Sequence, residues 1–120
     1  MSRERRLLGQ AGEALAADTL QQQGYAVLTR NYRTPYGEID LIARHGDTLV
    51  FIEVKLRRSE LFGPPQAAVN PAKQRHLKLA AQYYLSRHNA ADIKIRFDVV
   101  AITMTGHRPQ IQIFAGAIEG

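Results

Sequence analysis

Asp40, Glu53 and Lys55 have the residue types and the spacing of a metal-dependent site that acts on phosphate. Asp40 lies in an alternating apolar–polar segment over 38–44, and Glu53 and Lys55 lie in a second such segment over 49–56. Mg²⁺ prefers oxygen ligands, and proteins usually hold it with one or two carboxylates, water and phosphate. A lysine beside such a cation stabilises the negative charge of a phosphate. The chemistry that these residues could perform is therefore phosphodiester hydrolysis.

A tight turn between the two segments would bring the carboxylates together. Gly46-Asp47 is suited to a two-residue hairpin loop. In the register that this loop sets, Asp40 lies directly across from Glu53, and directly opposed residues of an antiparallel pair point to the same face. Lys55 shares that face with Glu53 because side chains alternate along a strand. The register thus predicts two acids and a lysine on one face.

An ordinary sheet surface is the alternative explanation of the same residues. Glu38 and Lys55 could form a cross-strand ion pair, with Asp40 and Glu53 solvated. A slip of one residue would also place Glu53 on the face opposite Asp40. In favour of a cation site, two carboxylates facing each other repel, and a divalent cation removes that conflict. The spacing alone leaves both interpretations open.

The surrounding pattern predicts a single α/β domain over 1–120. Gly24 is placed to end a first helix, and Asn70-Pro71 is placed to begin a second one. The pattern predicts helices over 5–23 and from 70, strands over 25–33, 38–44, 49–56, 93–103 and 110–115, and a loop over 60–66. Two sets of residues are each expected to share one side of their strand: Ile39, Leu41 and Ala43, and Val50, Ile52, Val54 and Leu56. The expected order is helix, three strands, helix, two strands, with a mixed sheet flanked by both helices.

The composition favours a nucleic-acid partner. The formal net charge is +5, with twelve arginines and four lysines, and the planar arginine fork suits phosphate. Arg57, Arg58 and Lys73 are candidates for contact with the nucleic-acid backbone. For Lys73 the alternative is a solvated lysine on the helix surface. There are no cysteines and no long apolar run, so we expect a cytoplasmic protein without a membrane partner.

The ordered motifs resemble the PD-(D/E)xK nuclease superfamily, in which an acid on one strand is followed by acid-x-Lys on the next. More closely, the chain is similar to the YraN family of bacterial proteins. The proline of the superfamily name is absent, because Ile39 precedes Asp40. The resemblance rests on Gly9 to Glu13, Gly24-Tyr25, Arg30 to Arg33, Gly37 to Ile42, Leu49 to Lys55, Phe62-Gly63, Lys73 and Arg96 to Val99.

This resemblance implies a restriction-endonuclease-like fold, akin to archaeal-type Holliday-junction resolvases. It implies Mg²⁺ or Mn²⁺ held by Asp40 and Glu53, with Lys55 as the catalytic lysine and Glu13 as a further carboxylate from the first helix. Glu13 has no lysine or arginine three or four residues away, which fits this role, whereas a partly exposed helix acid is the alternative. The implied substrate is DNA rather than RNA. By analogy to the resolvases, branched DNA is one of the DNA substrates that the resemblance allows.

Two other classes of protein compete with a nuclease. The first is a non-catalytic nucleic-acid-binding module that retains the nuclease fold. The second is an unrelated small α/β RNA-binding domain, against which the absence of an aromatic RNA-stacking motif argues. Asp98 is expected to form an ion pair with Arg30 or Arg33 rather than to bind metal. The sequence leaves open whether the chain forms a homodimer.

Overall fold

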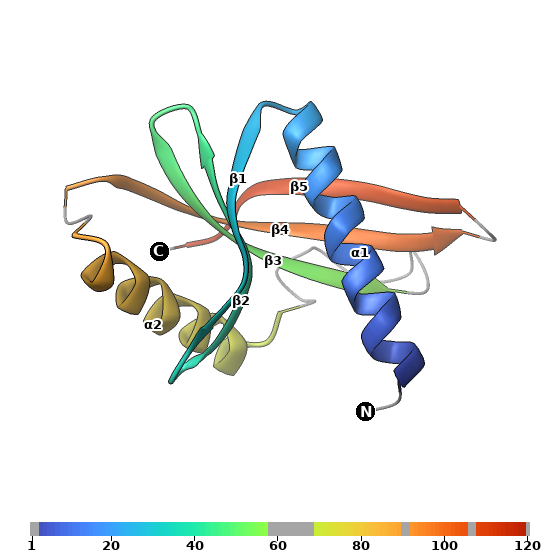
Figure 1. The fold of residues 1–120 in the computed structure, drawn as a ribbon, viewed down its shortest axis with the longest axis horizontal. Helices are drawn as coiled ribbons and strands as arrows, with labels where there is room; N and C mark the ends of the chain where they lie inside the picture. Colours follow the sequence, from blue (N-terminus) through green and yellow to red (C-terminus); the bar gives the residue numbers. More distant parts are fainter. Residues whose placement is uncertain (1–2, 58–68, 90–91, 106–107, 120) are drawn as a thin grey trace.

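The fold is a five-stranded sheet with one helix on each face, as seen in a computed structural model that describes residues 3–57, 69–89, 92–105 and 108–119 (Figure 1). Its elements are α1 (Arg3–Gln22), β1 (Tyr25–Thr34), β2 (Gly37–His45), β3 (Thr48–Arg57), α2 (Pro71–Arg87), β4 (Lys94–Thr105) and β5 (Arg108–Ile118). The predicted α/β class and element order are confirmed. The predicted loop over 60–66 lies outside the described residues.

The strands lie in the order β1-β2-β3-β4-β5 and form a mixed sheet. β3 and β4 are parallel, and the other neighbouring pairs are antiparallel. Parallel neighbours need a long crossover connection, and α2 lies in the connection between β3 and β4. Within the described residues, no helix has the length and apolarity needed to cross a bilayer.

Alternation along β3 supplies both hydrophobic cores. Val50 and Ile52 pack with Leu20 of α1, and the predicted common side of Val54 and Leu56 is confirmed. Phe51, which is fully buried, points the other way and packs with residues of α2. Burial of a side chain of this size contributes about 1.5–3 kcal/mol. The sheet is therefore covered on both faces.

The alternation of β2 changes at Asp40. Leu41 and Ala43 pack together on the side of α1, which confirms their predicted common side. Ile39 packs with Ile42 under α2, so its predicted place on that same side is wrong. Across the β1–β2 ladder, Asn31 has a φ of 55°, in the left-handed region that asparagine adopts more readily than most residues. Asp40 thus lies between a residue directed to one face and a residue directed to the other.

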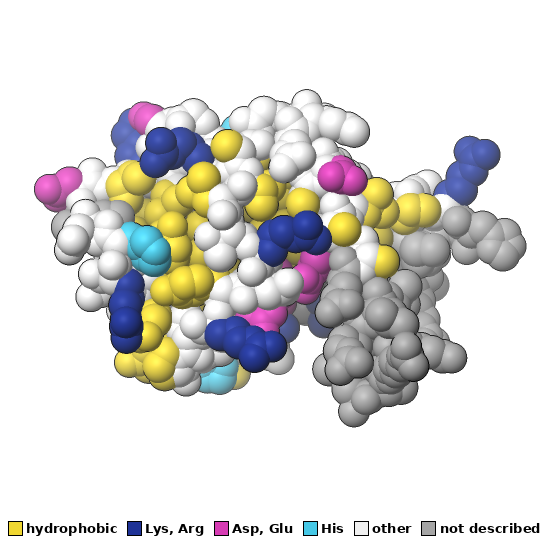
Figure 2. Space-filling model, in the orientation of Figure 1, with side chains coloured by type: hydrophobic (Ala, Val, Ile, Leu, Met, Phe, Trp, Pro, Cys, Tyr) yellow, Lys and Arg dark blue, Asp and Glu magenta, His cyan; other side chains and the backbone are white. Residues whose placement is uncertain are grey.

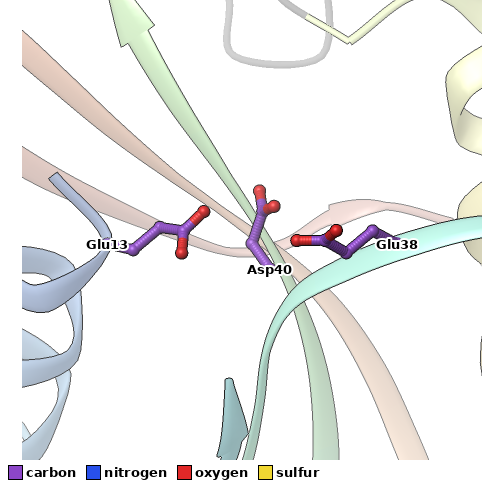
Figure 3. A group of neighbouring side chains, drawn as sticks. All are labelled: Glu13, Glu38 and Asp40. Carbon is purple, nitrogen blue, oxygen red and sulfur yellow. The ribbon is translucent and has the colours of Figure 1, made fainter. Parts of the chain in front are cut away.

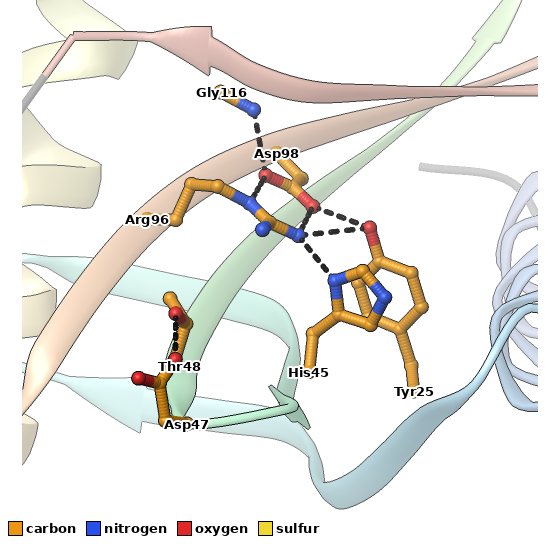
Figure 4. A network of polar contacts seen from close by, with 7 residues as sticks. All are labelled: Tyr25, His45, Asp47, Thr48, Arg96, Asp98 and Gly116. Atoms are coloured by element: carbon orange, nitrogen blue, oxygen red, sulfur yellow. Dashed lines mark hydrogen bonds and ion pairs between the residues drawn. The ribbon is translucent and has the colours of Figure 1, made fainter.

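A buried carboxylate joins three strands near the other end of the sheet. Asp98, with 0% exposure, accepts hydrogen bonds from Tyr25 Oη at 2.8 Å, Arg96 Nε at 2.8 Å, Arg96 Nη2 at 3.0 Å and Gly116 N at 2.8 Å (Figure 4). These contacts connect β1, β4 and β5. The expected pairing of Asp98 with Arg30 or Arg33 is wrong, because Arg96 reaches it from two residues away on the same strand.

His45 completes this network. Its ring stacks on Tyr25 with centroids 4.0 Å apart, and Nδ1 lies 3.0 Å from Arg96 Nη2. A guanidinium group only donates, so Nδ1 accepts. Burial, and then the hydrogen bond to Asp98, raise the pKa of Tyr25 to about 12. The hydroxyl of Tyr25 therefore stays a donor to Asp98 throughout the neutral pH range.

Asp98→Asn should destabilise the fold strongly, because Arg96 and Tyr25 lose the anion that they share. Breaking a buried ion pair typically costs about 3–5 kcal/mol, and the partial exposure of Arg96 places the expected loss near the lower end, at about 3 kcal/mol. Urea unfolding measures the change. Asp47→Asn is the matched control, since it breaks an exposed pair with Lys94 and should change stability little. Equal losses in both variants would contradict the assigned role of Asp98.

Candidate metal centre

Asp40 lies where β2 separates from β3. The antiparallel pairing runs from the turn to Leu41↔Ile52, which confirms the predicted hairpin register, and it ends there. Just past this point, Oδ2 of Asp40 accepts a hydrogen bond from the backbone N of Val54 at 2.8 Å. If the ladder continued, a main-chain carbonyl oxygen of β2 would accept the hydrogen bond from this N–H group. Here the carboxylate of Asp40 accepts it instead. Asp40 and Glu53 are therefore not paired across the ladder, as the predicted register would have made them. Both lie beside the opening that forms where β2 and β3 separate.

Three acidic side chains meet at this opening. Glu13 from α1 and Glu38 and Asp40 from β2 each place one carboxylate oxygen within 4.8 Å of the others (Figure 3). Glu38 is exposed, while Glu13 and Asp40 are half-buried. Arg33 approaches Glu38 at 3.8 Å, but this contact is between exposed groups and neutralises the cluster weakly. We call Glu13, Glu38 and Asp40 the acid triad.

Glu13 is held in the triad by a neighbour from β1. The side chain of Asn31 donates a hydrogen bond to Glu13, from the strand position whose backbone is left-handed. Burial raises the pKa of Glu13, the hydrogen bond from Asn31 opposes this, and the charge of Glu38 adds to it. The helix acid expected from the sequence therefore reaches Asp40, and Asn31 orients it.

The pKa of Asp40 is raised well above the ordinary value of an aspartate. Desolvation, and then the negative charge of Glu53, raise the pKa of Asp40 to about 7, although the hydrogen bond from Val54 opposes the shift. A carboxylic acid that shares its surroundings with other acids holds its proton into the neutral range. A divalent cation would displace that proton, because a metal ligand must be deprotonated.

Glu53 lies outside the acid triad and has a counter-ion of its own. Its side chain is 3% exposed, and Oε1 lies 2.7 Å from Nζ of Lys73 on α2. Burial alone would lower the pKa of Lys73, but the hydrogen bond and the charge of Glu53 together outweigh it and raise this pKa. Lys73, expected either to contact the nucleic-acid backbone or to be a solvated helix lysine, is half-exposed and pairs with Glu53, and its contact with nucleic acid stays a prediction. The proposed role of Glu53 as a metal ligand stays a prediction.

The remaining predicted site residues lie along and beyond β3. Lys55 follows Glu53 by two positions and is half-buried. Arg57 is the last residue of β3, and Arg58 lies outside the described residues. The catalytic role of Lys55 stays a prediction, and so does the contact of Arg57 and Arg58 with the nucleic-acid backbone.

A pocket of about 310 Å³ lies between the β1–β2 hairpin and the start of α2. Glu38 and Glu53 line it on the strand side, and Lys73 and His76 line it on the helix side. Tyr36, at the tip of the hairpin, adds an aromatic ring that is 46% exposed. On the face shown in Figure 2, acidic side chains lie close to lysine and arginine side chains between this hairpin and α1. The pocket therefore offers both signs of charge beside the triad.

Sequence reasoning missed two members of this site. The predicted register gives Glu38 only a role as a partner for Lys55, although the Glu-x-Asp spacing of Glu38 and Asp40 is a usable signal. Asn31 carried no usable signal, because its contact with Glu13 depends on how α1 packs against β1.

The sequence matches the family described as "Uncharacterised protein family UPF0102" over residues 12–102. A UPF0102 protein of Geobacter metallireducens is 45% identical over 99% of this chain and 98% of its own length. Those of Geotalea uraniireducens and Moorella thermoacetica are 48% and 49% identical, over 93% and 85% of this chain and 89% and 85% of their own lengths.

Two solved structures are similar to the chain. EndoMS, in a complex with double-stranded DNA, has a TM-score of 0.47 and 26% identity, over 81% of this chain and 37% of its own. SfsA of Pyrococcus furiosus, in a complex with Ca²⁺, has a TM-score of 0.40 and 14% identity, over 92% of this chain and 63% of its own.

The raised pKa of Asp40 predicts how stability depends on pH without metal. Between about pH 4 and pH 7 the unfolded chain has released the Asp40 proton while the folded protein retains it, so stability falls as pH rises and levels off above pH 7. Asp40→Asn should remove most of this slope. Urea unfolding of both proteins in a chelating buffer, from about pH 5 to about pH 8, measures it. Parallel profiles for the two proteins would show that Asp40 ionises without a penalty.

Proposed function

The chain belongs to the UPF0102 family, and we propose that it is a metal-dependent phosphodiester hydrolase, endonuclease-like, that acts on DNA. The acid triad carries this proposal. Glu13, Glu38 and Asp40 converge from a helix and a strand, and the half-buried Asp40 accepts a hydrogen bond from the backbone N of Val54. Repulsion among these carboxylates destabilises the fold, which is tolerable where a cation binds.

The donor set fits a hard divalent cation. All three triad members offer carboxylate oxygens, which Mg²⁺ and Mn²⁺ prefer over nitrogen and sulfur ligands. Asn31 lies beside one of these acids, Glu13, and lowers its pKa, as polar neighbours of metal ligands commonly do. Glu53, beside Asp40, is the fourth carboxylate within reach of the same region.

Each residue has a part in the proposed reaction. A cation held by Asp40, Glu13 and Glu38, with Glu53 as the predicted fourth ligand, would lower the pKa of bound water and neutralise the phosphate. Lys55 would stabilise charge that develops on the phosphate. Arg57 and Arg58 would hold the DNA backbone without reading its sequence. The excess of arginine over lysine supports a polyanionic partner.

A cleavage assay tests the proposal. Wild-type protein should cut plasmid, single-stranded or branched DNA in Mg²⁺ or Mn²⁺, and Asp40→Asn should abolish the cutting. Lys55→Ala should lower turnover by about 10²–10³-fold and lower DNA affinity much less, because its contact strengthens as charge develops.

Two outcomes would contradict the proposal. Cleavage that Asp40→Asn retains would come from a contaminant or another site. DNA binding without cleavage by any metal-loaded form would favour a non-catalytic module that retains the fold. Equal turnover of wild type and Lys55→Ala would remove Lys55 from the mechanism while leaving the acid triad in place.

A further inference from the structure

The ion pair between Glu53 and Lys73 joins a buried side chain to a half-exposed one. The Glu53 side chain is 3% exposed, whereas the Lys73 side chain is 53% exposed. A buried carboxylate that loses its counter-ion is costly, while an exposed ammonium regains water when it leaves. Lys73 can therefore leave Glu53 at low cost only where another cation, or a proton, neutralises the carboxylate.

The main chain of Lys73 is anchored, so only its side chain can move. Lys73 lies in the first turn of α2, directly after Pro71 and Ala72, and its backbone N donates to Oδ1 of Asn70 at 2.8 Å. This N-cap holds the start of the helix. Four flexible bonds of the lysine stem then let Nζ swing within the pocket that Lys73 lines.

That pocket connects the ion pair to the acid triad. Glu38 belongs to the triad and also lines the pocket, opposite Lys73 and His76. A ligand in this space would meet carboxylates on one side and basic groups on the other. A phosphate with a divalent cation attached has this charge pattern.

We propose that Lys73 exchanges partners: it neutralises Glu53 in the free protein, and it binds a phosphate of the nucleic acid once a divalent cation takes that carboxylate. The exchange rests on the proposed metal-dependent function and adds to it a phosphate-binding residue on α2. Cation binding then prepares the phosphate site, because it releases the ammonium that the phosphate needs.

Metal binding measured by calorimetry with MnCl₂ tests the first half of the exchange. Lys73→Gln removes the competitor of Mn²⁺ at Glu53, so Mn²⁺ should bind about threefold to tenfold more tightly than to wild type. Arg75→Gln, at an exposed position on the same helix, is the matched control for lost charge and should bind Mn²⁺ like wild type. A lysine with a structural role alone would lower the melting temperature and leave Mn²⁺ affinity unchanged, which would overturn the exchange.

DNA binding tests the second half. With Ca²⁺ and a short labelled duplex, Lys73→Gln should weaken binding several-fold more than Arg75→Gln does. Without any divalent cation, the two variants should weaken binding equally, because Lys73 is then held by Glu53. Equal losses in both conditions would show that Lys73 acts as an ordinary surface charge, and the exchange would be wrong.

A second variant protects the test against misfolding of Lys73→Gln. Lys73→Arg keeps a cation on Glu53, and its planar fork can hold a carboxylate with two hydrogen bonds, so Mn²⁺ should bind no more tightly than to wild type. Tighter Mn²⁺ binding by Lys73→Arg would contradict the exchange. If wild type itself fails to bind Mn²⁺, both the proposed metal site and the exchange fail. If wild type binds Mn²⁺ and Lys73→Gln does so equally well, the exchange alone fails.

Discussion

The hydrogen bond from the backbone N of Val54 to the carboxylate of Asp40 is the contact on which the candidate site depends. It ends the β2–β3 ladder with a side-chain acceptor instead of a carbonyl, so the two strands separate without leaving that donor unsatisfied. The separation gives Asp40 a position between the faces of the sheet. Glu13, from the helix on one face, and Glu53, which faces the helix on the other, can therefore both act on it.

Two aspartates of this sheet, one buried and one half-buried, show how surroundings separate a structural acid from a candidate ligand. Asp98 receives hydrogen bonds from Tyr25, Arg96 and Gly116, so its charge is matched and its network ties strands together. Asp40 receives one from Val54, and its burial, followed by the charge of neighbouring acids, raises its pKa. Among the described contacts, the charge of Asp40 is the less well compensated, and this imbalance supports the cation site that we propose at its end of the sheet.

Glu53 lies between these two cases. It is as buried as a structural acid, but its counter-ion comes from an exposed lysine on α2. Because α2 lies in the crossover between the parallel strands β3 and β4, the same connection that closes the fold also brings a basic residue to the acidic end of β3. The chemistry of the site is thus coupled to the topology of the sheet.

The sequence by itself determined the elements, their order and the hairpin register, because alternation, Gly46-Asp47 and the Asn70-Pro71 cap are local signals. The resemblance to known nucleases implied that Glu13 and Asp40 lie together, and their carboxylates do. Tertiary structure decided the rest. Ile39 lies on the side of α2 and not on the side of Leu41. Asn31 lies beside Glu13, and Lys73 of α2, rather than a residue of the hairpin, neutralises Glu53. These contacts join segments far apart in the chain, and their geometry depends on strand separation and helix packing, which no local pattern encodes.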